Sequence, residues 1–257
     1  MIEFDDGPSQ TFAGQFAAVP DYGALKSYFW YEWGPIFYRG RTDGSAKVLC
    51  VAQDPGATER IAGRTLVGDA GQRVQGFLNK IGLVRSYLCL NVYSFAMFPS
   101  QASAGKRLIT VPEHLAWRNA LFDMAKSPQL EAIIAFGVHA QKAVKLWPGR
   151  DAIPVVSIPH PSSRDETALL NAWRDAVVTL RAIVTPDPGA AADLPNYGAA
   201  FSEADYSAIP RADLPYGVPD FLGDDSVGRS ADSAQRSSVT RPNPDDRRTL
   251  IWKAPRT

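Results

Sequence analysis

The sequence predicts an α/β protein of three layers, in which helices cover both faces of a central four-stranded parallel sheet. Two observations support this fold class. Four short apolar runs recur along residues 1–185, and stretches with helical spacing of apolar side chains lie between them. Each run is also followed directly by polar or turn-forming residues. Alternation of strands and helices is typical of right-handed parallel crossovers.

The predicted strands are runs of mostly apolar residues, which suit strands covered on both faces. They span 48–52, 87–90, 132–136 and 154–158. The first run stops at Gln53-Asp54-Pro55-Gly56. Proline removes a ladder donor there and glycine permits turn dihedrals, so two polar side chains are left at the carboxyl end of the strand. In an open parallel sheet, ligands bind at that edge.

Helices are predicted where apolar side chains recur every three or four residues. They span roughly 21–33, 70–81, 112–126, 138–147 and 165–184. Gly82 is placed to end the second of these helices. A short edge strand is predicted at 36–39 and a loop at 57–66, and residues 1–20 are expected to wrap loosely over the fold.

Composition changes after Thr185, where Pro, Asp, Ser, Ala and Gly dominate without a helical or strand period. We therefore expect a catalytic-type domain over 1–185 and an extension over 186–257. Pairs of proline and aromatic residues in the extension are typical of segments that lie extended across a domain surface. The extension is predicted to be mostly irregular.

The charge balance is neutral overall but unequal along the chain. Residues 1–185 contain 19 Lys and Arg against 16 Asp and Glu, a net of +3, and residues 186–257 contain 8 against 11, a net of −3. A net charge of +3 over residues 1–185 is too small to predict nucleic-acid binding from charge alone. We expect a monomer.

Cys50 and Cys89 each lie inside an apolar run, where a thiol usually behaves as a small buried hydrophobe. Two cysteines give no disulfide framework and cannot supply four thiolate ligands. The acidic start has no long apolar segment, and no run of about 18 apolar residues occurs elsewhere. The expectations are a reducing, cytoplasmic setting and no membrane span.

Several polar residues fall at predicted strand ends, and each has an ordinary structural explanation. The Gln-Asp-Pro-Gly segment suits a turn, Asn91 is a common turn former, and His139 at a helix start is interpreted as structural. His160, between two prolines, could form the entry to the last helix. Their coincidence on one rim favours function, because a carboxylate, a carboxamide and an imidazole together suit hydrolysis at a carbonyl-bearing heterocycle.

Five segments in this order resemble motifs of the uracil-DNA glycosylase superfamily. Gln53-Asp54-Pro55 is similar to the Gly-Gln-Asp-Pro-Tyr-His motif, with Gly56 in place of the tyrosine, as in some branches. Segment 63–72 resembles the Gly-Arg-Pro-Phe-Val-Gly-x-Ala-Gly-Gln motif of the iron–sulfur branch. The other three are similar to the Leu-Leu-Leu-Asn strand, the Trp-Gly-x-His-Ala-Gln-Lys segment and the His-Pro-Ser-Pro loop; they lie at 88–91, 136–142 and 160–163.

The resemblance, which covers roughly residues 45–185, implies a mechanism and a set of roles. Asn91 would read the hydrogen-bonding edge of a uracil flipped out of DNA. Asp54 would position the attacking water and stabilise the cationic sugar. His160, as a neutral imidazole, would donate to uracil O2 as negative charge develops there.

The remaining implied contacts divide between the base and the DNA strand. Gln53, Gly56 and Leu66 would line the base pocket, and Ser162, Ser163 and Arg164 would contact DNA, with Arg164 at the wedge position. The resemblance implies no cofactor and no metal. The chain also departs from the pattern, since Leu66 replaces the stacking phenylalanine and the four cluster cysteines of the iron–sulfur branch are absent.

Three functions follow from this interpretation. The first is a DNA glycosylase that hydrolyses the N-glycosidic bond of uracil and leaves an abasic site. The second is a protein that binds uracil-containing or abasic DNA with little or no turnover, suggested by Leu66 and the long extension. The third is a nucleotide-handling or structural α/β domain, although no phosphate-binding Gly-x-x-x-x-Gly-Lys-Ser/Thr loop is present.

Overall fold

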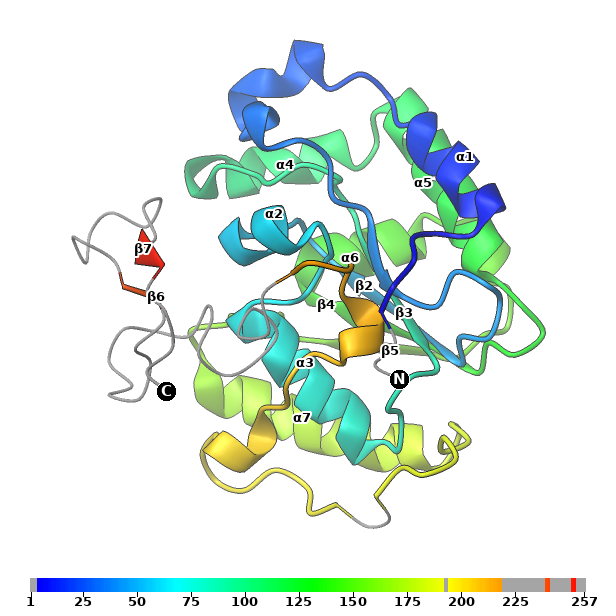
Figure 1. Ribbon diagram of the computed structural model, residues 1–257, viewed down its shortest axis with the longest axis vertical. Helices are drawn as coiled ribbons and strands as arrows, with labels where there is room; N and C mark the ends of the chain where they lie inside the picture. Colours follow the sequence, from blue (N-terminus) through cyan, green and yellow to red (C-terminus); the bar gives the residue numbers. More distant parts are fainter. Residues whose placement is uncertain (1–3, 192–193, 219–238, 241–250, 253–257) are drawn as a thin grey trace.

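The computed structural model describes residues 4–191, 194–218, 239–240 and 251–252, and a mixed sheet lies at its centre (Figure 1). The sheet has five strands in the order β1-β3-β2-β4-β5. They are β1 Tyr38–Gly40, β2 Val48–Ala52, β3 Tyr87–Asn91, β4 Ala132–Phe136 and β5 Val155–Ile158. Strands β2 to β5 are parallel and confirm the predicted fold class, while β1 pairs antiparallel with β3 as a fifth, edge strand.

Helices cover both faces of the sheet, as a three-layer fold requires. The α-helices are α1 Gln10–Ala17, α2 Ala57–Ala62, α3 Asp69–Lys80, α4 Ala102–Leu108, α5 Pro112–Ala125, α6 Gly137–Lys145 and α7 Glu166–Arg181. Shorter 3-10 turns are η1 Gly23–Tyr28, η2 Tyr31–Trp33, η3 Pro99–Gln101, η4 Pro148–Arg150, η5 Glu203–Asp205 and η6 Arg211–Asp213. Two short strands, β6 Val239–Thr240 and β7 Ile251–Trp252, pair separately. No helix in the described ranges has the length and apolar character needed to cross a bilayer.

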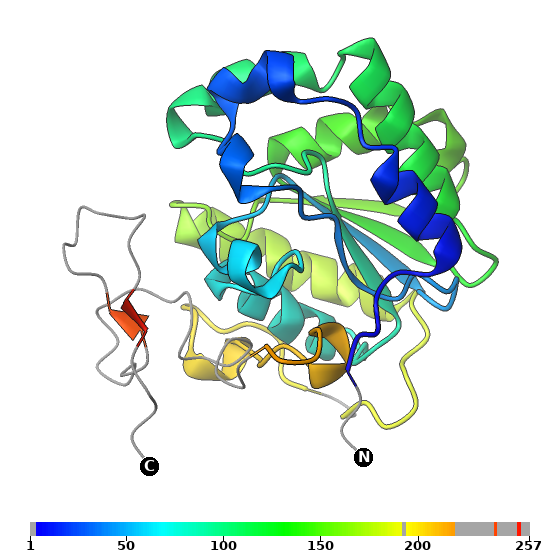
Figure 2. The ribbon, with the colours of Figure 1, turned by 45° about the horizontal axis from the view of Figure 1, so that its top comes forward.

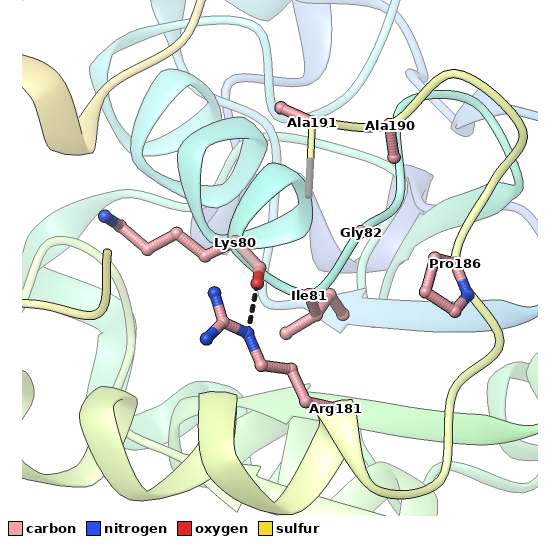
Figure 3. A pocket seen from close by; sticks show the side chains of 7 residues that line it. All are labelled: Lys80, Ile81, Gly82, Arg181, Pro186, Ala190 and Ala191. Atoms are coloured by element: carbon pink, nitrogen blue, oxygen red, sulfur yellow. Dashed lines mark hydrogen bonds between the residues drawn. The ribbon is translucent and has the colours of Figure 1, made fainter. Parts of the chain in front are cut away.

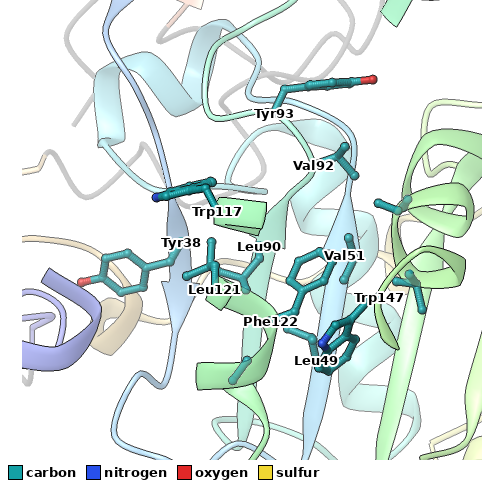
Figure 4. Close-up of a cluster of buried hydrophobic side chains, with 14 of the residues drawn as sticks. Tyr38, Leu49, Val51, Leu90, Val92, Tyr93, Trp117, Leu121, Phe122 and Trp147 are labelled. Atoms are coloured by element: carbon teal, nitrogen blue, oxygen red, sulfur yellow. The ribbon is translucent and has the colours of Figure 1, made fainter. Parts of the chain in front are cut away.

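Alternate residues of the buried strands feed two separate cores. Leu49 and Val51 of β2 face α1, α5 and α6, where the side chains of α5 and Trp147 pack over them (Figure 4). Val48 and Cys50 face the opposite side and pack with α3 and α7. Because successive side chains of a strand point to opposite faces, an unbroken apolar run can fill both cores.

Three local expectations near the start of the chain were wrong. The predicted helix over 21–33 is interrupted: Phe29 is extended and bridges Met97, and Trp30 N donates to Ala96 O at 2.8 Å. Residues 1–20 contain helix α1, held because its Phe16 ring stacks on Phe37 at 4.5 Å. The predicted loop over 57–66 contains the short helix α2.

The described part of the predicted extension lies against the α/β body. We call residues 194–218 the strap; its yellow-to-orange trace runs along α3 and α7 in two views (Figures 1 and 2). Tyr197 is buried in the α3–α7 core, and Asp205 forms an ion pair with Lys80 at 2.9 Å. The segment 219–257, apart from β6 and β7, lies outside the described residues, so the predicted irregularity there stays a prediction.

The segment before the strap, with Pro186, Ala190 and Ala191, lines a small pocket of about 320 Å³ between the ends of α3 and α7. Arg181 closes one side, because its Nε donates to the backbone oxygen of Lys80 at 2.7 Å (Figure 3). The Lys80 amine is directed to the strap, where it also donates to Pro195 O at 2.8 Å. The Arg181 guanidinium also donates to Leu194 O, so both cations fasten the strap to the two helices.

Removing the Asp213 carboxylate should destabilise the whole fold. It pairs with Arg39 at 3.1 Å, also pairs with Arg41, and accepts from the Tyr87 hydroxyl at 2.7 Å. Arg39 and Asp213 have side chains 0% and 1% exposed. Asp213→Ala leaves a buried guanidinium without a carboxylate, so we expect a loss of about 3–5 kcal/mol in the free energy of unfolding, measured by urea denaturation.

The exposed ion pair between Lys126 and Asp151 provides the control for that measurement. Lys126→Ala should cost under about 1 kcal/mol, because exposed pairs are solvated in both states. Equal losses in the free energy of unfolding for the two variants would contradict the assignment of Asp213 as the carboxylate that neutralises the buried Arg39.

Candidate active site

Polar residues at the ends of two neighbouring strands lie at the carboxyl edge of the sheet. Asn91, the last residue of β3, lies opposite Ala52, the last residue of β2. The pairing continues beyond both strands, since Tyr93 N donates to Gln53 O at 2.9 Å. Asn91 and Asp54 therefore leave adjacent strands at the same end, as their positions in the sequence predicted.

Asp54 is a partly buried carboxyl group held by the backbone of a distant loop. Its Oδ2 accepts from Met97 N at 2.7 Å. Burial raises the pKa of Asp54 to about 7, although the hydrogen bonds from Met97 and Gln53 act to lower it and the nearby Glu59 carboxylate raises it further. Near neutral pH the carboxyl group is thus divided between its protonated and ionised forms, which suits proton transfer or ionic stabilisation.

Asn91 is a buried amide that has no hydrogen-bond partner among the described residues. The residue is 4% exposed, and neither Nδ2 nor Oδ1 makes a hydrogen bond there. Buried polar groups are nearly always paired, and leaving one unpaired costs about 1–3 kcal/mol. An amide with both its donor and its acceptor unmatched is suited to bind a molecule that presents one acceptor beside one donor.

His160 follows β5 in a tight turn that fixes the ring. Its Nδ1 accepts from Ser162 N at 3.2 Å, and its carbonyl accepts from Ser163 N at 2.8 Å. Burial, together with the neighbouring His139, lowers the pKa of His160 to about 4. The imidazole is therefore neutral near pH 7, and because Nδ1 is an acceptor, the ring proton lies on Nε2, which is left as a donor.

An open pocket of about 540 Å³ lies beside this rim. Gln53 and His160 share its lining, although Asp54 and Asn91 are not among the lining residues. The lining residues are Gln53, Gly137, Val138, Gln141, Ser157, Ile158, Pro159, His160, Ser162 and Ser163. Gly137 has φ +79° and permits the close approach, because a Cβ there would lie 3.0 Å from His160 Cβ. Within the described ranges, no group of three or more His, Cys, Asp and Glu is arranged to hold a metal ion.

The other predicted base contacts lie on the segment after β2. Gly56 is exposed at the start of α2, and a Cβ there would meet Glu59 Oε2 at 2.8 Å. Leu66 is 6% exposed, has φ 53° and packs its side chain into the α3–α7 core. Gly71 presses on its backbone, since a Cβ at that position would lie 1.8 Å from Leu66 O. Base contacts by Gly56 and Leu66 stay predictions.

The predicted DNA-contacting residues lie on the turn that carries His160. Ser162 and Arg164 are exposed and Ser163 is partly buried. Ser162 and Ser163 line the pocket, and Arg164 is the next residue along the chain. Their contacts with DNA stay predictions. His139, interpreted from the sequence as structural, is buried in α6 with its Nδ1 3.1 Å from the Tyr93 hydroxyl.

Glu59 is a site-shaping residue that the sequence interpretation missed. Its carboxylate is buried and accepts from Gly56 N at 2.9 Å, Val67 N at 2.8 Å and Gly68 N at 2.9 Å. It therefore fixes the segment between β2 and α3 that faces the rim. A glutamate three residues after the first turn residue is the sequence pattern of a capping box, and that pattern could have revealed both α2 and this role.

The fold and the rim together define an α/β protein with a polar ligand site at the carboxyl edge of its sheet. A family model described as the uracil DNA glycosylase superfamily matches residues 39–177. The chain belongs to the uracil DNA glycosylase superfamily. DNA glycosylase chemistry and DNA as a partner are the general functions that this membership supports.

Solved structures of UNG from Nitratifractor salsuginis are among those similar to this chain. The wild-type structure is 14% identical, with 55% of this chain and 74% of that chain covered and a TM-score of 0.32. A tyrosine-to-glycine mutant of that protein is 15% identical, with 66% and 93% covered and a TM-score of 0.33. Among curated proteins, none matches this chain.

Proposed function

We propose that this protein removes uracil from DNA by hydrolysing the N-glycosidic bond and leaves an abasic site. The observation that carries the proposal is the buried Asn91 amide, whose donor and acceptor are both unpaired among the described residues, at the end of the strand next to the one that leads into Asp54. Uracil presents O4 as an acceptor next to N3–H as a donor, which is the complement of that amide. Cytosine presents the inverse pattern and would leave both groups of Asn91 unsatisfied.

The catalytic roles follow from the protonation states on the rim. Ionised Asp54 positions a water toward C1′ and stabilises the positive charge that forms on the sugar as the C1′–N1 bond breaks. The water oxygen then bonds to C1′, and its proton passes to the Asp54 carboxylate. The electron pair of that bond leaves with uracil, and its negative charge develops on O2. Because Nδ1 accepts from Ser162 N, the neutral His160 ring donates to that oxygen from Nε2. The proton stays on the ring, since a neutral imidazole is a very weak acid.

The proposal is tested on an oligonucleotide that carries one uracil, treated with enzyme and then with alkali, which cleaves abasic sites. Strand cleavage is expected with uracil and not with cytosine at the same position. Asn91→Asp should lower kcat/KM for uracil about 10–100-fold, because the carboxylate cannot donate to O4. Asn119→Asp makes the same change of charge on α5 and should leave the rate unchanged.

Two outcomes would contradict the proposal. An intact uracil strand at high enzyme concentration would exclude glycosylase activity, and a stable complex with uracil-containing or abasic DNA in the same sample would favour the binding function. Equal rates for Asn91→Asp and the wild-type protein would show that another residue reads the base.

A further inference from the structure

The turn that carries His160 is held from outside by side chains of two helices. The carbonyl before the histidine, Pro159 O, accepts from Trp173 Nε1 of α7 at 3.2 Å. The carbonyl of the residue after it, Pro161 O, accepts from Arg73 Nη1 of α3 at 3.1 Å. The carbonyl groups of the prolines on both sides of His160 are therefore held, and these two bonds help to set the position of the turn relative to the two helices.

Both of these side chains are in turn backed by the strap. The Phe201 ring packs edge-on against Trp173, with centroids 6.0 Å apart, and the Arg73 guanidinium carbon lies 4.4 Å from the centre of the same ring. Arg73 Nε also donates to the Tyr206 hydroxyl at 2.7 Å. One aromatic ring of the strap thus contacts both side chains that hold the histidine turn.

The backing matters because Arg73 has another partner in reach. Its Nη2 lies 3.6 Å from the Glu166 carboxylate at the start of α7, and that carboxylate is 54% exposed. A long arginine side chain is otherwise free to sample many rotamers, at a cost of about 2 kcal/mol when it is fixed. Phe201 and Tyr206 restrict the guanidinium to the orientation in which Nη1 reaches Pro161 O.

We infer that the strap contributes to the active site by positioning the His160 turn. Phe201 holds both Trp173 and Arg73, and Tyr206 also holds Arg73. Arg73 and Trp173 in turn act as positioning residues for the turn. The inference rests on the proposed function, in which His160 donates to the leaving base. A displacement of about 1 Å at a group that acts in the transition state costs up to about 10²-fold in rate. The segment beyond residue 185 therefore contributes to catalysis without touching the substrate.

Arg73→Ala and Phe201→Ala in the full chain test the inference. We expect each to lower kcat for uracil release roughly 10–100-fold, with KM for DNA within about threefold, because the defect lies in placing His160 and not in holding DNA. Arg73→Lys keeps the positive charge but cannot donate to both Tyr206 and Pro161 in the same way. It should therefore behave like Arg73→Ala, which separates positioning from attraction to phosphates.

Arg174→Ala is the matched control. Arg174 lies on α7 and fastens the same strap through Tyr197 O at 3.1 Å, yet it makes no bond to the histidine turn. The control should lower the melting temperature while leaving kcat per folded molecule within about threefold. A fall in kcat that merely follows the fall in stability across all these variants would overturn the inference.

A second readout does not depend on glycosylase activity. The chain has 3 histidines, so the ring nitrogens of His160 can be followed by ¹⁵N NMR, with His160→Gln to assign its signals. In the wild-type protein the ring should stay neutral on the Nε2–H tautomer down to about pH 5; in Arg73→Ala and Phe201→Ala it should titrate closer to an ordinary histidine. If the wild-type protein proves inactive but the two variants change the titration of His160 as expected, the proposed function is refuted and the positioning role of the strap stands. Active wild-type protein whose variants show neither the shift nor the loss of kcat would refute the strap's role alone.

Discussion

Asp54→Asn should lower the rate of uracil release by about 10²–10⁴-fold, with a modest loss of DNA affinity. The amide preserves the shape of the side chain and can still accept from Met97 N, the bond seen at 2.7 Å. It cannot stabilise positive charge on the sugar. Single-turnover rates on uracil-containing DNA, with binding measured separately, give both quantities.

The same carboxyl group predicts the pH dependence of the wild-type enzyme. The ionised form is the active one, and burial raises the pKa of Asp54 to about 7. The value of kcat/KM should therefore rise about tenfold per pH unit below pH 7 and level off above it. A profile that levels off near pH 4 would show that Asp54 ionises as in water and that its burial has no functional effect.

Asp54→Asn should also stabilise the fold at alkaline pH. The folded-state pKa of about 7 lies above the unfolded value of about 3.9, so the folded protein binds the proton more tightly between these values. The free energy of unfolding contributed by this group falls as the pH rises from about 4 to 7. We expect the variant to be more stable than the wild type by about 1–3 kcal/mol at pH 8 and close to it at pH 4.

Asp175→Asn on the exposed face of α7 is the control, and it should change stability little at either pH. If Asp54→Asn proved no more stable than the wild type at pH 8, Asp54 would not carry the desolvation cost assigned to it.

His160→Ala should cost about as much activity as Asp54→Asn, roughly 10²–10⁴-fold in kcat. The variant loses the Nε2 donor to uracil O2, while the affinity for DNA that carries an uncleavable uracil analogue should stay within about threefold. The acid limb of kcat/KM near pH 7 should persist, because it belongs to Asp54. Loss of that limb in His160→Ala would assign it to the histidine.

The titration of His160 acts on stability in the opposite direction to that of Asp54. Its pKa of about 4 in the folded state lies below the usual value of about 6.5, so the unfolded chain takes up the proton first as the pH falls. The wild-type protein should lose the stability contributed by this ring between about pH 6.5 and 4. His160→Ala should lose less over the same window, as measured by thermal unfolding at each pH.

The core of the fold could be predicted because its signal is local. The segments 48–52 and 132–136 are continuous apolar runs, and each is a strand with those bounds. The helix predicted over 70–81 differs from α3 by one residue at each end. In each case the pattern of apolar residues within one segment, a continuous run for the strands and a helical period for the helix, indicates its structure.

The segments that failed are those decided by distant partners. Phe29 and Trp30 have helical spacing, yet their backbone pairs with Met97 and Ala96, a contact about 67 residues away in the chain that no local pattern announces. The same loop supplies the Met97 N–H to Asp54. The sequence predicted that Asp54 and Asn91 follow or end strands at the same edge of the sheet. It could not show the backbone donor that holds the carboxyl group.

The Arg73 contacts were equally out of reach for sequence reasoning. Arg73 occupies an ordinary helical position, and its partners Pro161 and Tyr206 lie 88 and 133 residues away. The side chain of an arginine on a helix usually lies in solvent. The position of Arg73 in the sequence therefore predicts no contact with the strap or with the histidine turn. Only the folded arrangement joins the strap to the histidine turn.

The ion pair of Asp213 has a practical consequence for choosing where to cut this chain. The family match ends at residue 177, which invites expression of a fragment of about that length. Such a fragment keeps Arg39 inside the edge of the sheet, still bonded to Gln75 at 2.8 Å, but without its carboxylate. An inactive or insoluble product would then reflect an unbalanced interior charge and not the absence of repair chemistry.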